Sequence, residues 1–211
     1  MIADWPLHIA ARHGLYDEAR RLLEKGAAVD AVNDDGRAPL HLAAWNGHVE
    51  VPRLLIEKGA KVDVRNASQK TPLHLAAWSG HVEVARLLIA MGAEVGARNS
   101  YQWTPLHFAV RWGREAVARL LIEKGAEIDA RDQSQRTPLH WAAEWDREAA
   151  ARLLIEKMVR LLIQKGADLE ARDADGATPR QLAINEDNSP LASLLTESST
   201  GGTDRPRGQV A

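Results

Sequence analysis

Residues 71–92 read TPLHLAAWSGHVEVARLLIAMG and predict two short helices joined by a turn. Thr71 can cap the first helix, and Pro72 suits its first position because the first amide hydrogens of a helix have no partner inside it. Gly80 can adopt the left-handed conformation that ends a helix. A second helix is expected over residues 82–91, and a glycine follows it.

The same phrase recurs along the chain at a fixed distance. Copies of WPLH, APLH and TPLH place prolines 33 residues apart at Pro6, Pro39, Pro72, Pro105 and Pro138. A sixth copy, at Pro179, comes 41 residues after the fifth. Repetition with a period of about 20 to 50 residues is the mark of stacked repeats. The chain therefore divides into six repeats, over residues 1–32, 33–65, 66–98, 99–131, 132–172 and 173–197.

The period of 33 residues and the T-P-L-H-x-A phrase resemble those of the ankyrin repeat family. The resemblance covers residues 2–197. It implies an all-α fold, an ankyrin-repeat α-solenoid of stacked helix-turn-helix units with hairpin loops, in which each repeat contacts its neighbours. We expect a single domain over residues 1–197. The remaining segment, 198–211, is polar and rich in Gly, Ser and Thr, and is predicted to be a disordered tail.

Composition narrows the classes of partner and the compartment. A net charge of -2 over 211 residues gives no electrostatic attraction to nucleic acid or an anionic membrane. The chain has no cysteine, which excludes disulfides and thiolate metal sites and fits a reducing compartment. The start, MIADWPLHIAARHG, lacks a signal-peptide pattern, and no stretch approaches the ~18 apolar residues of a membrane span. We expect a cytoplasmic protein with no nucleic-acid or membrane partner.

The hairpins depart from the family pattern at one position. The family glycine is present as Gly36 and Gly176, but Gln69, Gln102 and Gln135 replace it in the three repeats between them. If the backbone stays left-handed there, each glutamine costs about 1 kcal/mol relative to glycine. Either these hairpin tips are reshaped or they carry a selected contact.

Five histidines recur in the repeated phrase and raise the question of a metal site: His8, His41, His74, His107 and His140. Equivalent positions of packed helices lie roughly 10 Å apart, which is too far for two imidazoles to bind one ion at ~2 Å. We expect no metal, and the resemblance implies that these histidines form hydrogen bonds between repeats. Since no nucleotide-binding, nucleophile-elbow or zinc-protease motif appears, we also expect no cofactor and no enzymatic activity.

The tryptophans form a second periodic set. Trp45 and Trp78 occupy the same place near the end of the first helix of successive repeats, and Trp112 and Trp145 lie one residue later in the next two. The resemblance implies partner binding along a concave face of hairpin tips and first helices, and tryptophan is a favoured interface anchor. The alternative is that each indole fills space against the neighbouring helix. Trp141, inside its helix, is expected in the core.

Further partner-binding candidates lie on the hairpins and at the ends of the first helices. Their mixture of polar, charged and aromatic side chains suits an adaptable protein-binding edge more than a basic nucleic-acid stripe. These candidates are Asp34, Asp35, Arg37, Asn46, Ser68, Lys70, Ser79, Tyr101, Trp103, Arg111, Ser134, Arg136 and Glu144.

The fifth repeat contains a local duplication. Residues 152–166 read RLLIEKMVRLLIQKG, and the shift of eight from Arg152 to Arg160 equals the excess of 41 over 33. No Gly or Pro interrupts residues 147–165, which predicts one continuous helix of about 18 residues and ~27 Å. Its aliphatic side chains would spread over about 200° of the circumference, wider than the ~100° that a surface helix buries.

Three arrangements could cover this surplus. The closing repeat could stack out of line, one copy could loop out, or the aliphatic side chains could pair with another molecule, including a second copy of this chain. A long helix with a displaced closing repeat is favoured. The candidates for self-association are Leu153, Leu154, Ile155, Met158, Val159, Leu161, Leu162 and Ile163.

Together these patterns predict a non-enzymatic scaffold that binds a partner protein along its concave face, with the row of tryptophans as anchor. The alternative is a self-associating or engineered solenoid that forms a homodimer or larger oligomer through the enlarged helix of the fifth repeat. The identity of a partner does not follow from an ankyrin fold, since such folds host many unrelated roles.

Overall fold

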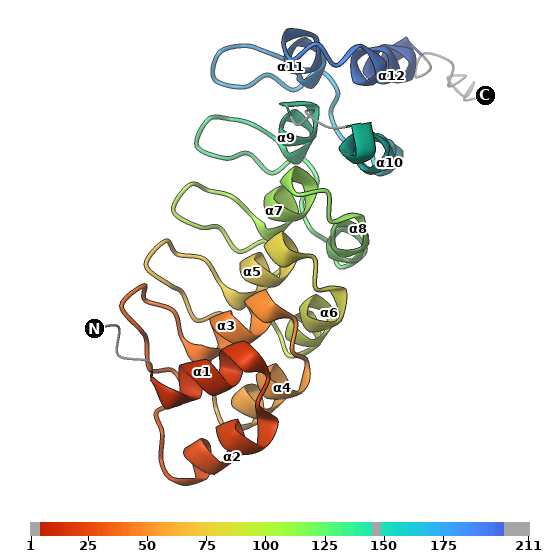
Figure 1. The fold of residues 1–211 in the computed structure, drawn as a ribbon. Coiled ribbons are helices and arrows are strands. Elements are labelled where there is room, and N and C mark those ends of the chain that lie inside the picture. Colours follow the sequence, from red (N-terminus) through yellow and green to blue (C-terminus); the bar gives the residue numbers. More distant parts are fainter. Residues whose placement is uncertain (1–4, 145–148, 201–211) are drawn as a thin grey trace, which may run out of the picture. The chain divides into compact units, whose positions relative to one another are not determined.

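The computed structural model describes residues 5–144 and 149–200, and within these ranges it gives no side-chain placement for residues 149–155, 199 and 200. The described residues form helices joined by turns and loops, with no strand among them. They belong to two compact units, Met1–Glu127 and Ile128–Ala211, and each is considered by itself (Figure 1). The single domain expected over residues 1–197 stays a prediction.

The first unit contains four helix pairs, one for each of the first four repeats. Its helices are α1 (Pro6–His13), α2 (Tyr16–Glu24), α3 (Pro39–Asn46), α4 (Glu50–Glu57), α5 (Pro72–Ser79), α6 (Val82–Ala90), α7 (Pro105–Arg111) and α8 (Glu115–Glu123). The first helices of successive repeats pack on one another, and so do the second helices, so the pairs form two rows with the hairpins beside the first row (Figure 1).

The helix ends of the third repeat follow the sequence prediction. Thr71 is the N-cap of α5 and Pro72 its first residue. Gly80 ends α5 with a φ of 87°, a left-handed value that other residues adopt only at a cost. The predicted second helix over residues 82–91 is α6, which ends one residue earlier.

The core of the first unit is made of small and branched apolar side chains. In α5, the side chains of Leu73, Ala76 and Ala77 are fully buried between the neighbouring first helices. Leu88 of α6 is fully buried as well. Alanine lets helices approach closely, and leucine fills the space between the two rows. The predicted all-α stack of helix-turn-helix units is therefore confirmed.

The hairpins keep the same backbone in the repeats that carry glutamine. The side-chain carbonyl of Asn66 accepts hydrogen bonds from the amides of Ser68 and Lys70, both at 3.0 Å, and Gln69 between them has a φ of 58°. The other two glutamines are left-handed too, at 62° for Gln102 and 58° for Gln135. The tips are therefore not reshaped, and each glutamine carries the cost of the left-handed conformation.

The second unit contains α9 (Pro138–Glu144), α10 (Ala149–Gln164), α11 (Pro179–Asn185) and α12 (Ser189–Thr200). Helix α9 packs against α10 and α11, and α11 packs against α12. Helix α10 is one continuous helix of 16 residues, whereas α6 has nine. The prediction of a single long helix is confirmed, and the alternative in which one copy loops out is wrong.

The second copy of the duplicated phrase takes the core positions. The buried side chains of α10 among those described are Met158, Val159, Leu161 and Leu162. Counted back from the glycine after each helix, they match the buried residues of α6, which are Val84, Ala85, Leu87 and Leu88. The first copy therefore extends the helix at its N-terminal end. Four of the residues predicted for self-association are buried in their own chain, and Ile163 is half-buried. The side chains of Leu153, Leu154 and Ile155 lie outside the described part.

The closing repeat keeps the register of the regular repeats. His140 bonds the carbonyl of Ala177 at 3.1 Å, as His74 bonds that of Trp103 in the first unit. The amide of Ala174 also donates to the Ser134 carbonyl, at 2.9 Å, which is the hairpin contact expected of neighbouring repeats. The expected displacement is therefore wrong for the hairpin and first helix of this repeat, because the extra residues are accommodated before the second copy.

The last described helix enters the segment predicted as a disordered tail. Helix α12 runs to Thr200, three residues into the stretch 198–211. The hydroxyl of Ser198 donates to the carbonyl of Leu194 at 2.9 Å, a bond that holds this polar end to the helix. Residues 201–211 lie outside the described part. Across the described helices, none is both long and apolar enough to cross a membrane.

Candidate functional site

The histidines of the repeated phrase fix the hairpins on the first helices. In α5, Nδ1 of His74 accepts hydrogen bonds from the Thr71 amide at 3.0 Å and the Thr71 hydroxyl at 2.8 Å. Its Nε2 then carries the proton and donates to the carbonyl of Trp103 in the next repeat, at 3.0 Å. Burial lowers the pKa of His74 to about 4, so the ring stays neutral near pH 7.

Equivalent bonds hold the backbone of two cationic hairpin residues, Arg37 and Lys70. His8 bonds the carbonyl of Arg37, and His41 bonds that of Lys70, both at 2.9 Å. The role implied for these histidines by the family resemblance is confirmed for the four whose bonds are described. No group of three metal-binding side chains occurs within residues 5–144 and 149–200.

A second set of side chains reaches back to the ends of the first helices. Nε2 of His48 bonds the carbonyl of Arg12, and Nε2 of His81 bonds that of Trp45, both at 3.0 Å. In the next repeat an arginine does the same, because Nε of Arg114 donates to the Trp78 carbonyl at 3.0 Å. These bonds satisfy helix C-terminal carbonyls and hold the tryptophan positions in line.

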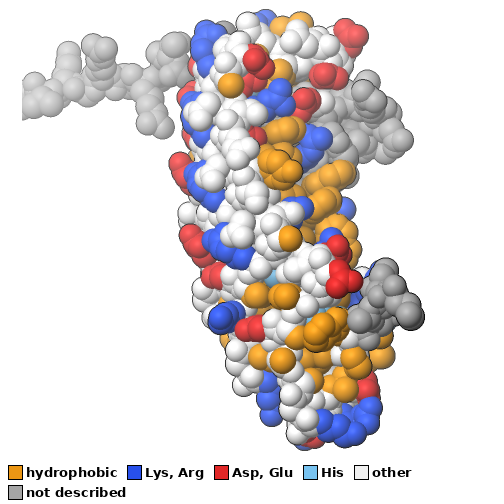
Figure 2. All heavy atoms as spheres, turned by 90° about the vertical axis from the view of Figure 1, so that its left-hand side faces the viewer, with side chains coloured by type: hydrophobic (Ala, Val, Ile, Leu, Met, Phe, Trp, Pro, Cys, Tyr) orange, Lys and Arg blue, Asp and Glu red, His pale blue; other side chains and the backbone are white. Residues whose placement is uncertain are grey.

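Five aromatic side chains on this face contact one another and are called here the aromatic row: Trp45, Trp78, Trp103, Phe108 and Trp112. Trp45 meets Trp78 edge to face at 5.0 Å, and Trp78 stacks on Trp112 at 5.7 Å between ring centroids. Phe108 is buried, whereas the four tryptophans are half-buried. Each of these indoles therefore packs against a neighbouring ring and also presents part of its surface to solvent. Figure 2 shows hydrophobic side chains exposed on the side of the molecule that carries the hairpins.

Two cations lie over the rings of the aromatic row. The Lys70 amine is 4.7 Å from the ring centroid of Trp78 and 5.5 Å from that of Phe108. The Arg111 guanidinium is 5.8 Å from the Trp103 ring centroid. Burial, followed by the positive charge of Arg37, lowers the pKa of Lys70. The aromatic row thus carries a positive potential at its edge.

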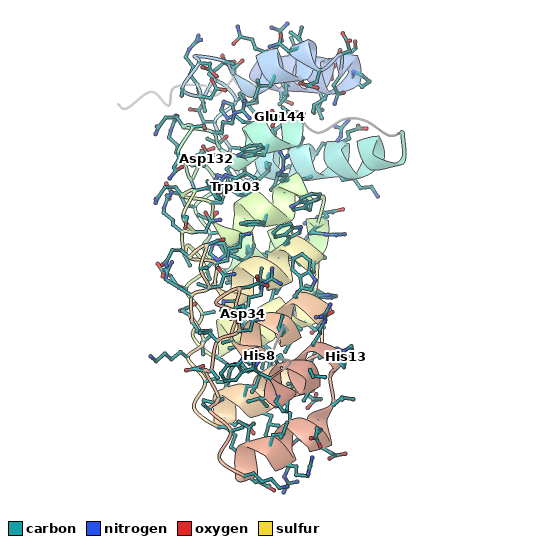
Figure 3. All side chains as sticks on the ribbon, turned by 60° about the vertical axis from the view of Figure 1, so that its left-hand side comes forward. His8, His13, Asp34, Trp103, Asp132 and Glu144 are labelled. Atoms are coloured by element: carbon teal, nitrogen blue, oxygen red, sulfur yellow. The ribbon has the colours of Figure 1, made fainter. Side chains whose placement is uncertain are left out.

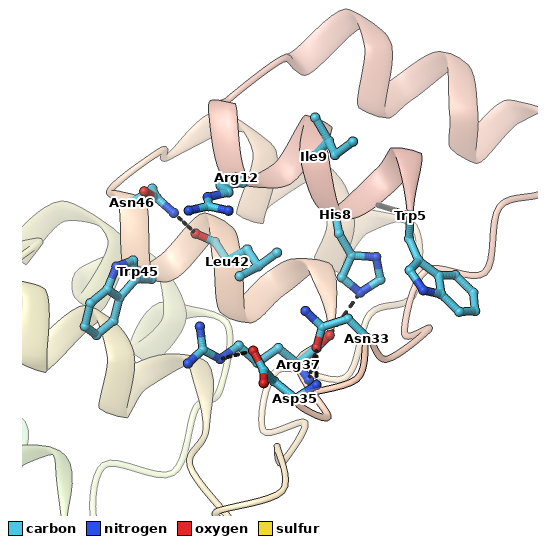
Figure 4. Close-up of a pocket in the computed structure, with 10 residues that line it drawn as sticks. All are labelled: Trp5, His8, Ile9, Arg12, Asn33, Asp35, Arg37, Leu42, Trp45 and Asn46. Carbon is cyan, nitrogen blue, oxygen red and sulfur yellow. Dashed lines mark hydrogen bonds and ion pairs between the residues drawn. The ribbon is translucent and has the colours of Figure 1, made fainter. Parts of the chain in front are cut away.

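A hollow of about 340 Å³ adjoins the aromatic row, where α1, α3 and the hairpin at residues 33–37 come together (Figure 4). Trp5 and Ile9 are exposed on its rim, Leu42 lies deeper, and Trp45 and Arg37 form the side toward the aromatic row. Sequence reasoning missed Trp5, Ile9, Leu42 and also Arg12. Arg12 had a usable signal, because it occupies in its repeat the place of Trp45 and Trp78.

Comparison with known proteins decides the family. A family model described as ankyrin repeats, in three copies, matches residues 4–66, 62–132 and 95–158. The chain belongs to the ankyrin repeat family. A search of curated proteins found no match. Ankyrin repeats are generally modules for protein–protein interaction and are typically not enzymes.

In the second unit of this ankyrin repeat protein, the cation on the hairpin is Arg136, and it is paired with carboxylates. Nη1 of Arg136 lies 3.1 Å from both carboxylate oxygens of Glu144, and its Nε lies 3.5 Å from Asp173. The guanidinium also lies 4.9 Å from the ring centroid of Trp141. Trp141 was expected in the core, but it is half-buried and its indole N–H donates to Asp132 at 2.9 Å. A core position would leave that donor without an acceptor.

The predicted partner-binding residues fall into three groups. The first unit brings together on one face the side chains of Arg37, Trp45, Lys70, Trp78, Trp103, Arg111 and Trp112. Around them, Asp34, Asp35, Asn46 and Tyr101 are exposed, and Ser68 and Ser79 are half-buried; Figure 3 labels Asp34 and Trp103. The second unit holds Ser134, Arg136 and Glu144. Trp145 lies outside the described residues.

Proposed function

We propose that this protein is a non-enzymatic scaffold that binds a partner protein on the first unit, across the aromatic row and the adjoining hairpins. The observation that supports this most strongly is the aromatic row itself. It presents contiguous, half-buried tryptophans next to a hollow whose rim includes the exposed Trp5 and Ile9. A cytoplasmic location is part of the proposal, and the lack of cysteine in the sequence fits it.

The composition of this face matches that of a protein interface. Interface centres are enriched in tryptophan, tyrosine and arginine, and their rims are polar. Here the tryptophans form the centre, while Asp34, Ser68 and Tyr101 lie on the hairpins beside them. Since the indoles are already held by neighbouring rings, little side-chain entropy remains to be lost when a partner covers them.

The rings differ in how far they serve the fold. Trp78 contacts Trp45, Phe108 and Trp112 together with Lys70, so its removal would loosen the stack as well as the surface. Trp45 lies at one end of the row and lines the hollow. Tyr101, on a hairpin tip, is 60% exposed. Trp45 and Tyr101 are therefore the residues that separate binding from folding.

The test is affinity capture from a lysate of the source organism with the intact chain and a Trp45→Ala/Tyr101→Ala variant. We expect the variant to lose the captured protein while its helical circular dichroism stays unchanged. The matched control is Met91→Ala, which removes an apolar side chain that is 38% exposed after α6, a second helix. Capture that is equal for the intact chain and the double variant would contradict the proposal.

Self-association through α10 gains no support from the described residues. The second copy of the duplicated phrase is used inside the chain, with Met158 and Leu162 nearly or fully buried. We therefore keep the homodimer outside the proposal.

A further inference from the structure

We propose that the partner segment bound by the first unit is acidic, with a carboxylate placed between Lys70 and Arg37 and a neighbouring apolar side chain placed in the hollow beside Trp45. This inference rests on the proposed function and specifies the chemistry of the partner. Four observations carry it: an unneutralised lysine, a weakly paired arginine, a neutralised counterpart in the second unit, and the hollow.

Lys70 is a half-buried cation without a carboxylate partner among the described residues. Its amine lies over the rings of Trp78 and Phe108, at 4.7 and 5.5 Å from their centroids. A ring face attracts a cation but does not neutralise it. The amine is therefore held in place, partly out of water, with hydrogen-bond donors still available to a ligand.

Arg37 adds a second positive charge on the same face. Its own nearest carboxylate is that of Asp35, at 4.0 Å, and the Asp35 side chain is 69% exposed. A pair this long and this exposed contributes little. Arg37 and Lys70 occupy equivalent hairpin positions in consecutive repeats. The positive charge of Arg37 contributes to lowering the pKa of Lys70. An anion placed near both would relieve their mutual repulsion.

The second unit shows what a neutralised version of this position looks like. Arg136 occupies the hairpin position of Lys70, and Glu144, eight residues later, lies 3.1 Å from it. Eight residues after Lys70 and after Arg37, the chain has Trp78 and Trp45 instead. The first unit therefore has the cation and lacks the internal carboxylate, and we assign that carboxylate to the partner.

The hollow supplies the apolar half of the recognition. Arg37 and Trp45 both line it, so a side chain inside it would lie next to the proposed carboxylate position. Its volume of about 340 Å³ suits one large side chain, whose apolar part would meet Ile9 and Leu42 while polar side chains such as Asn33 line the rest of the hollow. A nucleic acid needs a row of cations for its row of phosphates, whereas this hairpin presents Arg37 next to the exposed carboxylates of Asp34 and Asp35.

The experiment selects ligands from a random dodecapeptide library displayed on phage, with the full chain as bait, and measures the selected peptides by fluorescence anisotropy. We expect the enriched peptides to carry Asp or Glu next to Leu, Phe or Trp. An Arg37→Gln/Lys70→Gln variant should bind them at least about tenfold more weakly, and added salt should weaken binding to the intact chain. The matched control is Arg53→Gln/Lys58→Gln, which removes the same charge from exposed positions on and after α4 and should leave affinity unchanged.

Several outcomes would overturn the inference. These are enrichment of neutral or basic peptides, failure to enrich any peptide, equal binding by the Arg37→Gln/Lys70→Gln variant, or a single-stranded oligonucleotide that binds as tightly as the selected peptides. The two proposals fail in different ways. If the selected peptides no longer bind the Trp45→Ala variant but keep their affinity for the Arg37→Gln/Lys70→Gln variant, the protein-binding face is supported and the acidic partner is contradicted. Peptides that bind both variants as tightly as the intact chain would contradict both proposals.

Discussion

The repeats at residues 66–98 and 132–172 share the phrase TPLH and differ in two features. The first has a nine-residue second helix, and the second has a 16-residue one. The first leaves Lys70 over an indole without a carboxylate, and the second surrounds Arg136 with Glu144 and Asp173. The repeat therefore tolerates extra length at one end of its second helix and varies in charge at the hairpin position of Lys70 and Arg136.

The tolerated end is the N-terminal end of the second helix. In both repeats the buried residues lie at the same distances before the final glycine, Gly92 or Gly166, and each glycine is left-handed. Adding eight residues before this segment changes nothing in it. The hairpin that follows is also unchanged, since His140 and His74 make equivalent bonds to it.

The largest effect is expected from acid, and it should differ between the two repeats. The pKa of His74 is lowered to about 4 in the folded chain, against 6.5 for the free side chain, because burial opposes its charge. The unfolded chain therefore binds more protons between these values, so stability is full above pH 6.5 and falls as pH drops toward 4. We expect a loss of about 3 kcal/mol from His74 and a similar loss from His41, whose pKa is also lowered to about 4.

His140 is the internal comparison for this titration. Burial lowers its pKa as well. The bond to the Ala177 carbonyl and the charge of Asp173 oppose the shift and Arg136 and Arg131 add to it, whereas the charges that act on His74, those of Arg65 and Lys70, are both positive. NMR titration should therefore find His140 protonating at a higher pH than His74. A His74→Gln variant should lose less stability on acidification, because glutamine does not titrate. Gln181 shows that glutamine can make the bond of His74, since it accepts the equivalent amide bond from Thr178 at 2.9 Å. Protonation of His74 near pH 6.5, seen by NMR, would contradict this account.

The next effect tests which copy of RLLI is in the core. Leu162 is fully buried, and Leu162→Ala should lower the free energy of unfolding by about 3 kcal/mol, as should Leu88→Ala in the shorter helix. Deletion of residues 150–157 keeps the buried second copy and should cost less than about 1 kcal/mol. Urea unfolding measures all three. A deletion as costly as Leu162→Ala would show that the first copy carries the packing.

A smaller effect on stability should distinguish the two hairpin cations, Arg136 and Lys70. Arg136→Gln leaves Asp173, whose side chain is 2% exposed, without its cation, and we expect a loss of about 2 kcal/mol. Lys70→Gln removes a half-buried charge that has no carboxylate partner, and we expect a change within about 0.5 kcal/mol of zero. Thermal unfolding of both variants checks this. Equal losses would mean that Lys70 is also part of an internal ion pair.

The smallest effect should be the same in both repeats. Gln69 and Gln135 each have a φ of 58°, so Gln69→Gly and Gln135→Gly should each stabilise the chain by about 0.5 to 1 kcal/mol. Urea midpoints of the two single variants would show it. If either glycine variant is less stable than the parent chain, the glutamine at that tip makes a contact that outweighs its backbone cost.

Much of the fold was predictable because its determinants are local. Thr71, Pro72 and Gly80 act within one turn of the helix they begin or end, so their spacing was enough to place α5. The sequence left open whether glutamine reshapes the hairpin tips, and the structure shows that the three glutamines keep the left-handed backbone. The choice between the two copies in α10 was left open, although counting back from Gly166 would have indicated the second.

The tryptophans of the candidate site were predictable, but their contacts and the residues of the hollow were not. The period of 33 residues put Trp45 and Trp78 on one face, but whether their rings contact each other depends on the approach of separate helices. The same holds for Trp141, which turns to Asp132 because an indole N–H needs an acceptor. The hollow beside Trp45 joins residues from α1, α3 and a hairpin, so no single stretch of sequence marks it.

The histidine bonds run in both directions along the first unit. His41 reaches forward to the carbonyl of Lys70, and His48 reaches back to that of Arg12. The second and third repeats are thus each tied to both neighbours by side chains of their own. If the first unit is pulled from its ends in a single-molecule experiment, these ties bear the load in parallel with the apolar core. A repeat should therefore release together with the bonds on both of its sides, in steps whose length corresponds to one repeat of chain.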